Sequence, residues 1–64
     1  MIICIDVGNT NIKYAIYKEE ELKFSFRVAT DLKKTSDEYG AQLSSMLETN
    51  GVRLSEITEA LFRR

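Results

Sequence analysis

The chain opens on an unbroken apolar run, Met1 to Ile5, which stops at a carboxylate, Asp6. The run is rich in isoleucine, whose branched side chain favours strands, and a strand without polar alternation is typically covered on both faces. We therefore expect a central strand over residues 1–7. Asp6 then lies at the mouth of a core strand, and a charge directly after a buried isoleucine calls for an explanation.

Two further segments alternate apolar and polar residues, which is the pattern of half-buried strands. They span residues 11–18 and 22–30, and the acidic segment 19–21 separates them as a solvated turn. Strands joined by such short turns predict an antiparallel meander of three strands. The apolar faces expected to be buried carry Ile12, Tyr14 and Ile16 in the first segment and Leu22, Phe24, Phe26 and Val28 in the second.

A helix is predicted after these strands. Thr35 stands three residues before Glu38, the spacing of a capping box, in which a hydroxyl and a carboxylate each accept a backbone N–H at the helix start. Apolar residues then recur with a helical period, and Gly51 suits the position just beyond a helix end. These signals predict a helix from about Ser36 to Asn50 that covers one face of the sheet. Its apolar stripe consists of Tyr39, Leu43, Met46 and Leu47.

The remaining residues indicate a short helical turn over 54–58 and the start of a fourth strand at 60–62. The predicted fold class is α/β, as an α+β fragment with a three-stranded antiparallel meander and one covering helix. One face and one edge of this meander lack cover, so we expect the chain, which stops at Arg63–Arg64, to be the front part of a longer domain, truncated before the fourth strand is complete. A self-contained mini-domain is the alternative.

Composition argues against several classes of function. Nine basic and ten acidic residues give a net charge of −1 without a basic block, so neither nucleic acid nor a membrane surface is an expected partner. The single cysteine, Cys4, lies in the first apolar run, which excludes a disulfide framework. No window approaches the roughly 18 apolar residues of a membrane-spanning helix. We expect a cytoplasmic protein in a reducing compartment.

The chemistry is concentrated in the eight consecutive residues that begin with Asp6, which offer a carboxylate, two amides, a hydroxyl and an ammonium. The glycine among them can adopt φ > 0 and lets a ligand approach the backbone, while the amides and the hydroxyl supply hydrogen-bond donors. This combination suits a phosphate held with a magnesium ion. The candidate site comprises Asp6, Val7, Gly8, Asn9, Thr10, Asn11, Ile12 and Lys13.

The same residues also have a purely structural interpretation. Asp6 could initiate a turn, Gly8 could be an ordinary hairpin glycine and Lys13 a solvated strand lysine. The three polar residues at 9–11 are common in turns, so their weight comes from their occurrence together. Lys13 alternates with Ile12 and therefore faces away from the core, from where its ammonium could reach a phosphate.

The order of these signals resembles the N-terminus of the type III pantothenate kinases. These enzymes belong to the acetate and sugar kinase, Hsp70 and actin superfamily, whose phosphate-gripping hairpin has the pattern D-x-G-x-T-x-x-K, met here by Asp6, Gly8, Thr10 and Lys13. The similarity continues through Arg27 and the Thr30–Asp31 pair, for which we expect a structural placement, to the Asp-Glu-Tyr-Gly helix start at 37–40. It weakens over 59–64, where the family's fourth strand usually has small and β-branched residues.

The resemblance implies a ribonuclease H-like first half of an actin-like ATPase or kinase domain, with residues 1–64 as its N-terminal portion. It implies transfer of the ATP γ-phosphoryl group to pantothenate, giving 4′-phosphopantothenate in coenzyme A biosynthesis. Asp6 would hold Mg²⁺, and a monovalent cation, K⁺ or NH₄⁺, is expected from the family. The catalytic base is expected in later segments, so no catalytic residue is assigned here and the isolated chain is expected to be inactive. The full-length family member is expected to be a homodimer.

Two other classes of function stay open. One is a non-catalytic accessory transcription-factor relative of the same family, which would keep the fold. The other is an interaction module that pairs through its exposed sheet edge. Only the kinase needs Asp6, Gly8 and Thr10 together.

Overall fold

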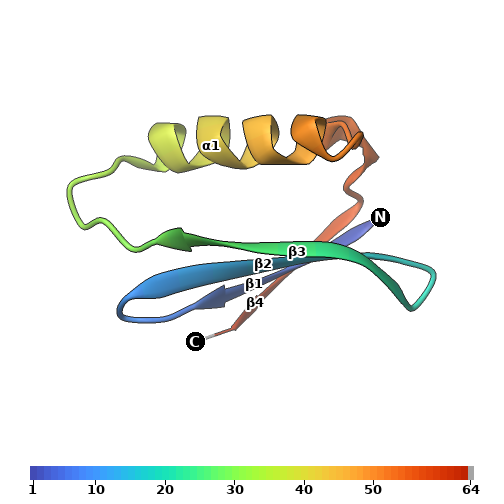
Figure 1. The fold of residues 1–64 in the computed structure, drawn as a ribbon, viewed down its shortest axis with the longest axis horizontal. Helices are drawn as coiled ribbons and strands as arrows, with labels where there is room; N and C mark the ends of the chain where they lie inside the picture. Colours follow the sequence, from blue (N-terminus) through green and yellow to red (C-terminus); the bar gives the residue numbers. More distant parts are fainter. Residues whose placement is uncertain (64) are drawn as a thin grey trace.

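The computed structural model describes residues 1–63 and shows one helix lying on one face of a four-stranded sheet (Figure 1). The predicted α+β class is confirmed, and the helix begins at the expected residue. Arg64, the last residue of the sequence, lies outside the residues that the structure describes. In chain order, the elements are β1 (Ile2–Val7), β2 (Asn11–Lys18), β3 (Glu21–Ala29), α1 (Ser36–Thr49), the 3-10 turn η1 (Leu54–Glu56) and β4 (Glu59–Arg63).

The strands are arranged in the order β3-β2-β1-β4. β1 pairs antiparallel with β2, and β2 pairs antiparallel with β3, but β4 lies parallel to β1, with Ile2 beside Glu59 and Asp6 beside Arg63. β1, β2 and β3 thus have the antiparallel pairings predicted for them, but β4 adds a parallel pair, so the sheet as a whole is mixed and not the three-stranded antiparallel meander that was expected. The physical reason is the helix, because α1 carries the chain back along the sheet and lets the next strand run in the direction of the first.

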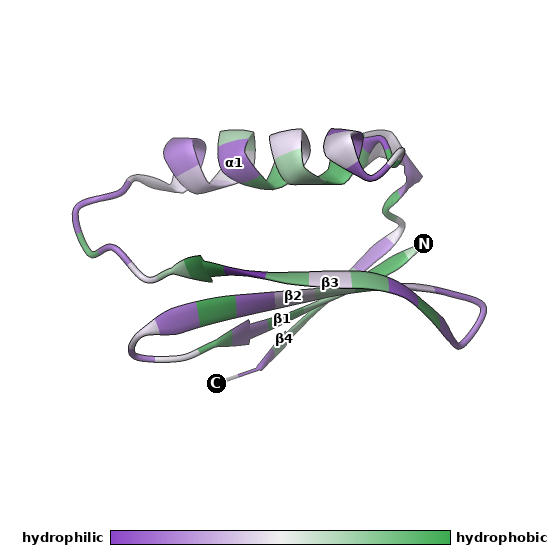
Figure 2. Cartoon of the chain, in the orientation of Figure 1, coloured by the Kyte–Doolittle hydropathy of each residue, from purple (hydrophilic) through white to green (hydrophobic). Residues whose placement is uncertain are grey.

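The hydrophobic core lies between α1 and the sheet. The predicted burial of every second residue of β2 is confirmed, and Ile16 and Leu47 are fully buried. Figure 2 shows the hydrophobic residues of α1 turned toward the sheet. Burial of each such side chain stabilises the fold by roughly 1.5–3 kcal/mol. The buried residues are Ile3, Ile12, Tyr14, Ile16, Leu47 and Val52.

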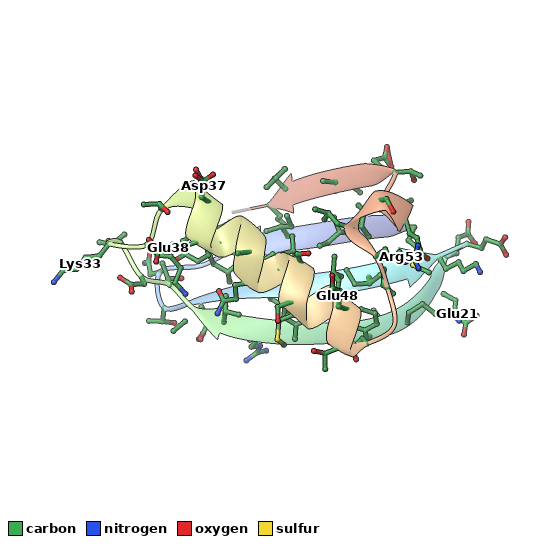
Figure 3. All side chains as sticks on the ribbon, turned by 90° about the horizontal axis from the view of Figure 1, so that it is seen from above. Glu21, Lys33, Asp37, Glu38, Glu48 and Arg53 are labelled. Atoms are coloured by element: carbon green, nitrogen blue, oxygen red, sulfur yellow. The ribbon has the colours of Figure 1, made fainter. Side chains whose placement is uncertain are left out.

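Only one face of the sheet is covered. Seen from above, α1 runs across β1, β2 and β3 and leaves most of β4 open (Figure 3), and Phe62 of β4 is 75% exposed. Ile3 is buried on the helix side of β1, whereas Cys4, on the opposite side, is only partly buried. The expectation that both faces of the first strand are covered is therefore wrong for residues 1–63, because no second layer lies under the sheet.

Both ends of α1 are capped as the sequence predicts. The Thr35 hydroxyl accepts the Glu38 backbone N–H at 3.2 Å, and the Glu38 carboxylate accepts the Thr35 N–H at 3.3 Å. At the other end Gly51 has a φ of 78°, and the N–H of Val52 donates to the carbonyl of Leu47 at 2.9 Å. This is a Schellman motif with its apolar contact, so the helix end and the core share the same two residues.

The β2–β3 hairpin contains an irregularity that decides which side chains face the core. Near the turn Lys18 pairs with Glu21, but a bulge between Ile16 and Tyr17 shifts the register, so that Ile16 pairs with Phe24. The shift turns Phe24 toward the core, as predicted, but Leu22 on the turn side of the bulge is 51% exposed, against expectation.

No helix within residues 1–63 is long and apolar enough to cross a membrane.

Candidate functional site

The turn between β1 and β2 closes tightly on Gly8. Its N–H donates to the carbonyl oxygen of Asn11 at 2.9 Å, and a Cβ built at Gly8 would lie 3.0 Å from that same oxygen. The positive φ expected at Gly8 is not observed. Within residues 1–63, the glycine with a positive φ is Gly51. A glycine is required at this position because a Cβ would press against the Asn11 carbonyl oxygen, which belongs to the backbone and cannot turn away as a flexible side chain could. The requirement is therefore steric and does not come from a left-handed backbone conformation.

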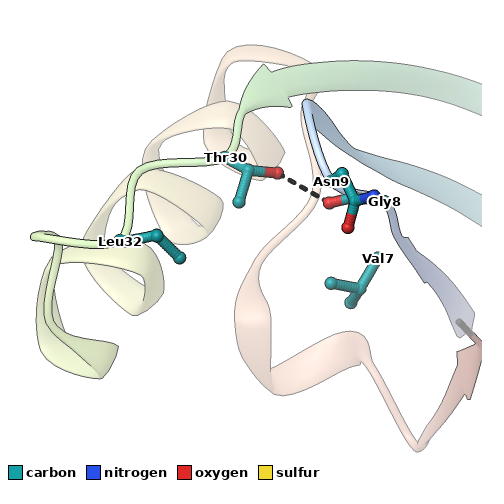
Figure 4. A pocket seen from close by; sticks show the side chains of 5 residues that line it. All are labelled: Val7, Gly8, Asn9, Thr30 and Leu32. Atoms are coloured by element: carbon teal, nitrogen blue, oxygen red, sulfur yellow. Dashed lines mark hydrogen bonds between the residues drawn. The ribbon is translucent and has the colours of Figure 1, made fainter.

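Thr30, just beyond the end of β3, ties this turn to the third strand. Its hydroxyl donates to the carbonyl oxygen of Gly8 at 3.0 Å, and its N–H donates to the carbonyl oxygen of Thr10 at 2.9 Å. Figure 4 shows Thr30 reaching across to Gly8. Thr30 thus has the structural role expected for it. Its two hydrogen bonds hold the candidate phosphate-binding turn from outside the β1–β2 hairpin.

The segment after Thr30 is fixed to the helix. The Tyr39 hydroxyl accepts the N–H of Asp31 at 2.8 Å and donates to its carbonyl oxygen at 3.0 Å. The Asp31 carboxylate accepts the N–H of Lys33 at 2.9 Å, which makes an Asx turn. The Lys34 ammonium lies 5.1 Å from the centre of the Tyr39 ring. The Tyr39 hydroxyl therefore ties the Asp-Glu-Tyr-Gly helix start to the backbone of Asp31, the residue that follows Thr30.

The structure divides the eight predicted site residues into three groups. Ile12 is buried under α1 and anchors the hairpin. Val7 and Asn9 line an open hollow together with Thr30 and Leu32, and Gly8 borders both this hollow and the next one (Figure 4). The remaining five line a second hollow of about 240 Å³, and Arg27 of β3 completes its wall. These five are Asp6, Gly8, Thr10, Asn11 and Lys13.

The register of the sheet brings the charged residues of this second hollow side by side. Asp6 on β1 pairs with Lys13 on β2, and Lys13 pairs with Arg27 on β3. All three are exposed and lie on the face opposite α1. The ion pair found within residues 1–63 joins Lys23 Nζ to Glu21 Oε1 at 3.8 Å. The Asp6 carboxylate thus has a lysine on the neighbouring strand but no ion pair with it.

The donor set suits magnesium held mainly by water and phosphate. No group of three or more histidine, cysteine, aspartate or glutamate side chains gathers within residues 1–63. Asp6 is the carboxylate in the wall of the hollow, and the Thr10 hydroxyl and the Asn11 amide lie in the same wall. Mg²⁺ usually keeps several waters and takes one or two carboxylates beside the phosphates of its substrate. A protein cage of carboxylates is not what these residues form.

Comparisons with known proteins show the family to which the chain belongs. Residues 2–62 match the model of the type III pantothenate kinase family, and the chain belongs to this family. It is 48% identical over 61 residues to a type III pantothenate kinase of Finegoldia magna, and 46% identical over 61 residues to one of Agathobacter rectalis. A third relative of the same name, from Moorella thermoacetica, is 49% identical over 57 residues.

These alignments take in almost all of this chain but little of each relative. They cover 95%, 95% and 89% of the chain, but 23%, 24% and 22% of the respective relatives. The chain therefore spans about a quarter of the length of the curated relatives it matches.

Proposed function

We propose that this chain is the part of a type III pantothenate kinase that grips the phosphates of ATP. The observation that carries the proposal is the placement of Asp6 and Lys13 side by side on an exposed face, at the base of a turn that Thr30 holds in shape. Phosphoryl transfer depends on positioning and on charge neutralisation more than on covalent chemistry of the protein. A rigid turn flanked by one carboxylate and one ammonium suits that task.

Different residues of the hollow would bind the metal ion and the phosphate. Asp6, with Thr10 and Asn11 beside it, would hold Mg²⁺ through its water shell, and Lys13 would meet a phosphate oxygen as a point charge. The chemistry that Mg²⁺ would supply at this place is neutralisation of the negative charge of the phosphates. Gly8 leaves the backbone open to the ligand, since it places no side chain over the turn.

The rest of the proposed activity belongs to a longer protein. We propose that residues 1–64 form the first, ribonuclease H-like portion of an actin-like kinase domain. In that protein, later segments would supply the base that activates pantothenate, the pantothenate pocket, the site for K⁺ or NH₄⁺ and the contacts of a homodimer. The product would be 4′-phosphopantothenate, which enters coenzyme A biosynthesis.

The proposal is tested first on this chain. We expect ATP to bind weakly and more tightly with Mg²⁺ than without it, as followed by amide chemical shifts. Asp6→Asn removes the charge at little cost in volume, so the gain from Mg²⁺ should disappear while the thermal midpoint stays within a few degrees. Asp37→Asn is the matched control, because Asp37 lies in the first turn of α1, away from the hollow. A gain from Mg²⁺ that survives in Asp6→Asn excludes Asp6 from the site.

The second test concerns turnover. The isolated chain should show no phosphorylation of pantothenate, because useful catalysis needs about 8 kcal/mol or more of transition-state stabilisation from several groups held together. A chimera in which this chain replaces the matching part of the Finegoldia magna relative should be active, and Asp6→Asn should abolish that activity. A fully active Asp6→Asn chimera would favour the accessory-factor or edge-pairing alternatives, since neither needs this carboxylate.

A further inference from the structure

A row of four charged residues crosses all four strands on the face opposite α1. Asp6 of β1 pairs with Lys13 of β2 on one side and with Arg63 of β4 on the other, and Lys13 pairs with Arg27 of β3. Paired residues of neighbouring strands point to the same face of a sheet. The row therefore reads Arg27, Lys13, Asp6, Arg63 from one edge to the other.

The bulge in the β2–β3 hairpin places Arg27 in this row. On the turn side of the bulge Lys18 pairs with Glu21, and a ladder continued without the shift would set Lys13 against Phe26. The extra residue moves the register by one and sets Lys13 against Arg27. A one-residue shift exchanges the two faces of a strand, so the same bulge sends Phe26 to the core and Arg27 to the site.

The charges in the row are not balanced within residues 1–63. Three cations accompany one carboxylate, although the whole chain has a net charge of −1. Lys13 and Arg27 lie directly opposite each other on adjacent strands. Cβ atoms at such positions are typically about 5 Å apart, and like charges there repel each other. Both are exposed, and neither makes a recorded ion pair within the described residues. A bound anion between them would relieve this repulsion.

We propose that Arg27 is a second phosphate-binding residue, which takes one phosphate group of a polyphosphate chain while Lys13 takes its neighbour. This inference rests on the proposed function, because it assumes that Lys13 meets phosphate. Arg27 and Lys13 line the same hollow of about 240 Å³, together with Asp6. A guanidinium presents a planar fork of N–H groups that matches two oxygens of one phosphate, whereas an ammonium acts as a point charge. The ligand class is a nucleoside triphosphate or another triphosphate.

The probe is inorganic tripolyphosphate with Mg²⁺, titrated into this chain and followed by amide chemical shifts. We expect Arg27→Gln to weaken binding about tenfold, as for the loss of a charge-assisted hydrogen-bonded contact. Arg27→Lys should recover part of the loss, since it keeps the charge without the fork. Lys18→Gln is the matched control, because it removes an equally exposed cation from the far end of β2 and should change binding less than twofold.

Three outcomes separate this inference from the proposed function. If Lys13→Gln weakens binding and Arg27→Gln does not, Arg27 is not a phosphate residue and the proposed function stands. If neither variant weakens binding, both proposals are wrong. If Lys18→Gln weakens binding as much as Arg27→Gln, the effect is one of net charge and the inference is overturned. Unchanged thermal midpoints and unchanged amide shifts in the core show that the variants report on binding and not on folding.

Discussion

The hydroxyl of Thr30 donates a hydrogen bond of 3.0 Å to the carbonyl oxygen of Gly8, which lies 22 positions earlier in the chain. The bond joins the end of the third strand to the turn between the first two. With the backbone bond from Thr30 to Thr10, it leaves the turn held at two points from outside its own hairpin. A turn held in this way keeps its shape without a ligand, so less of the binding energy is needed to order it.

Thr30→Val should loosen the phosphate turn. The substitution keeps the shape of the side chain but removes the hydroxyl, at a cost of about 1 kcal/mol in the free energy of unfolding. Hydrogen exchange at residues 8–11 should become faster, and tripolyphosphate should bind more weakly.

Thr58→Val is the control for this change. Thr58 makes a comparable bond, from its hydroxyl to the carbonyl oxygen of Met1 at 3.2 Å, at the other end of β1. It should cost similar stability and leave exchange at the turn unchanged. Equal effects of the two variants on the turn would mean that Thr30 acts only through global stability.

Leu47→Ala should unfold much of the population. Leu47 is fully buried, and its carbonyl oxygen accepts the N–H of Val52 at the helix end, so the cavity would open where the helix meets the core. Such substitutions cost about 2–5 kcal/mol, which is a large part of the stability of a domain this small. Urea unfolding followed by circular dichroism measures the loss. Leu54→Ala, at a position that is 51% exposed, should cost less than about 1 kcal/mol.

Glu20→Gly should stabilise the fold. Glu19 and Glu20 form a two-residue hairpin loop with φ of 51° and 70°, a backbone conformation that costs a residue with a Cβ about 1 kcal/mol or more. Glycine adopts it freely, and a net gain of about 0.5–1 kcal/mol is expected after the added entropy of the unfolded chain. The thermal midpoint should rise. Glu21→Gly, one residue later and inside β3, should lower it, and a fall in both would show that the loop is not strained.

Tyr14 should make the fold sensitive to alkaline pH. Burial, and secondarily the charge of Tyr39, raise the pKa of Tyr14 above its ordinary value of 10.0. The folded state then holds its proton where the unfolded state releases it, so the contribution to stability is complete below pH 10 and is lost as pH rises through the folded pKa. Tyr14→Phe should remove this loss. Urea unfolding of both proteins across this range tests it, and parallel curves would contradict it.

The features that could be predicted from the sequence are those that depend on neighbours a few residues away. The capping box of Thr35 and Glu38, and the helix end at Gly51, involve contacts within one or two helical turns. The buried face of β2 follows from alternation alone, as Ile16 shows. The same applies to the clustering of polar residues after Asp6.

The features that were missed depend on pairing between distant segments. The parallel placement of β4 beside β1 follows from the path of α1 and leaves no local signal. Arg27 enters the hollow because the bulge at Ile16 and Tyr17 changes the register, and a regular alternation of residues does not reveal a bulge. The positive φ expected at Gly8 was wrong, and the close approach of the Asn11 carbonyl oxygen, which does require a glycine there, becomes visible only in three dimensions.

The pairing of β1 with β4 also affects how the chain reaches this fold. β1, β2 and β3 can associate through short hairpin loops, whereas Ile2 meets Glu59 only after almost the entire chain has been brought together. The entropy of closing a loop rises with its length, and non-local pairing of this kind slows folding. We expect the two hairpins to form early and the strand at 59–63 to dock last. During synthesis on a ribosome, the edge of β1 that later receives β4 would stay open until nearly all of these residues had emerged.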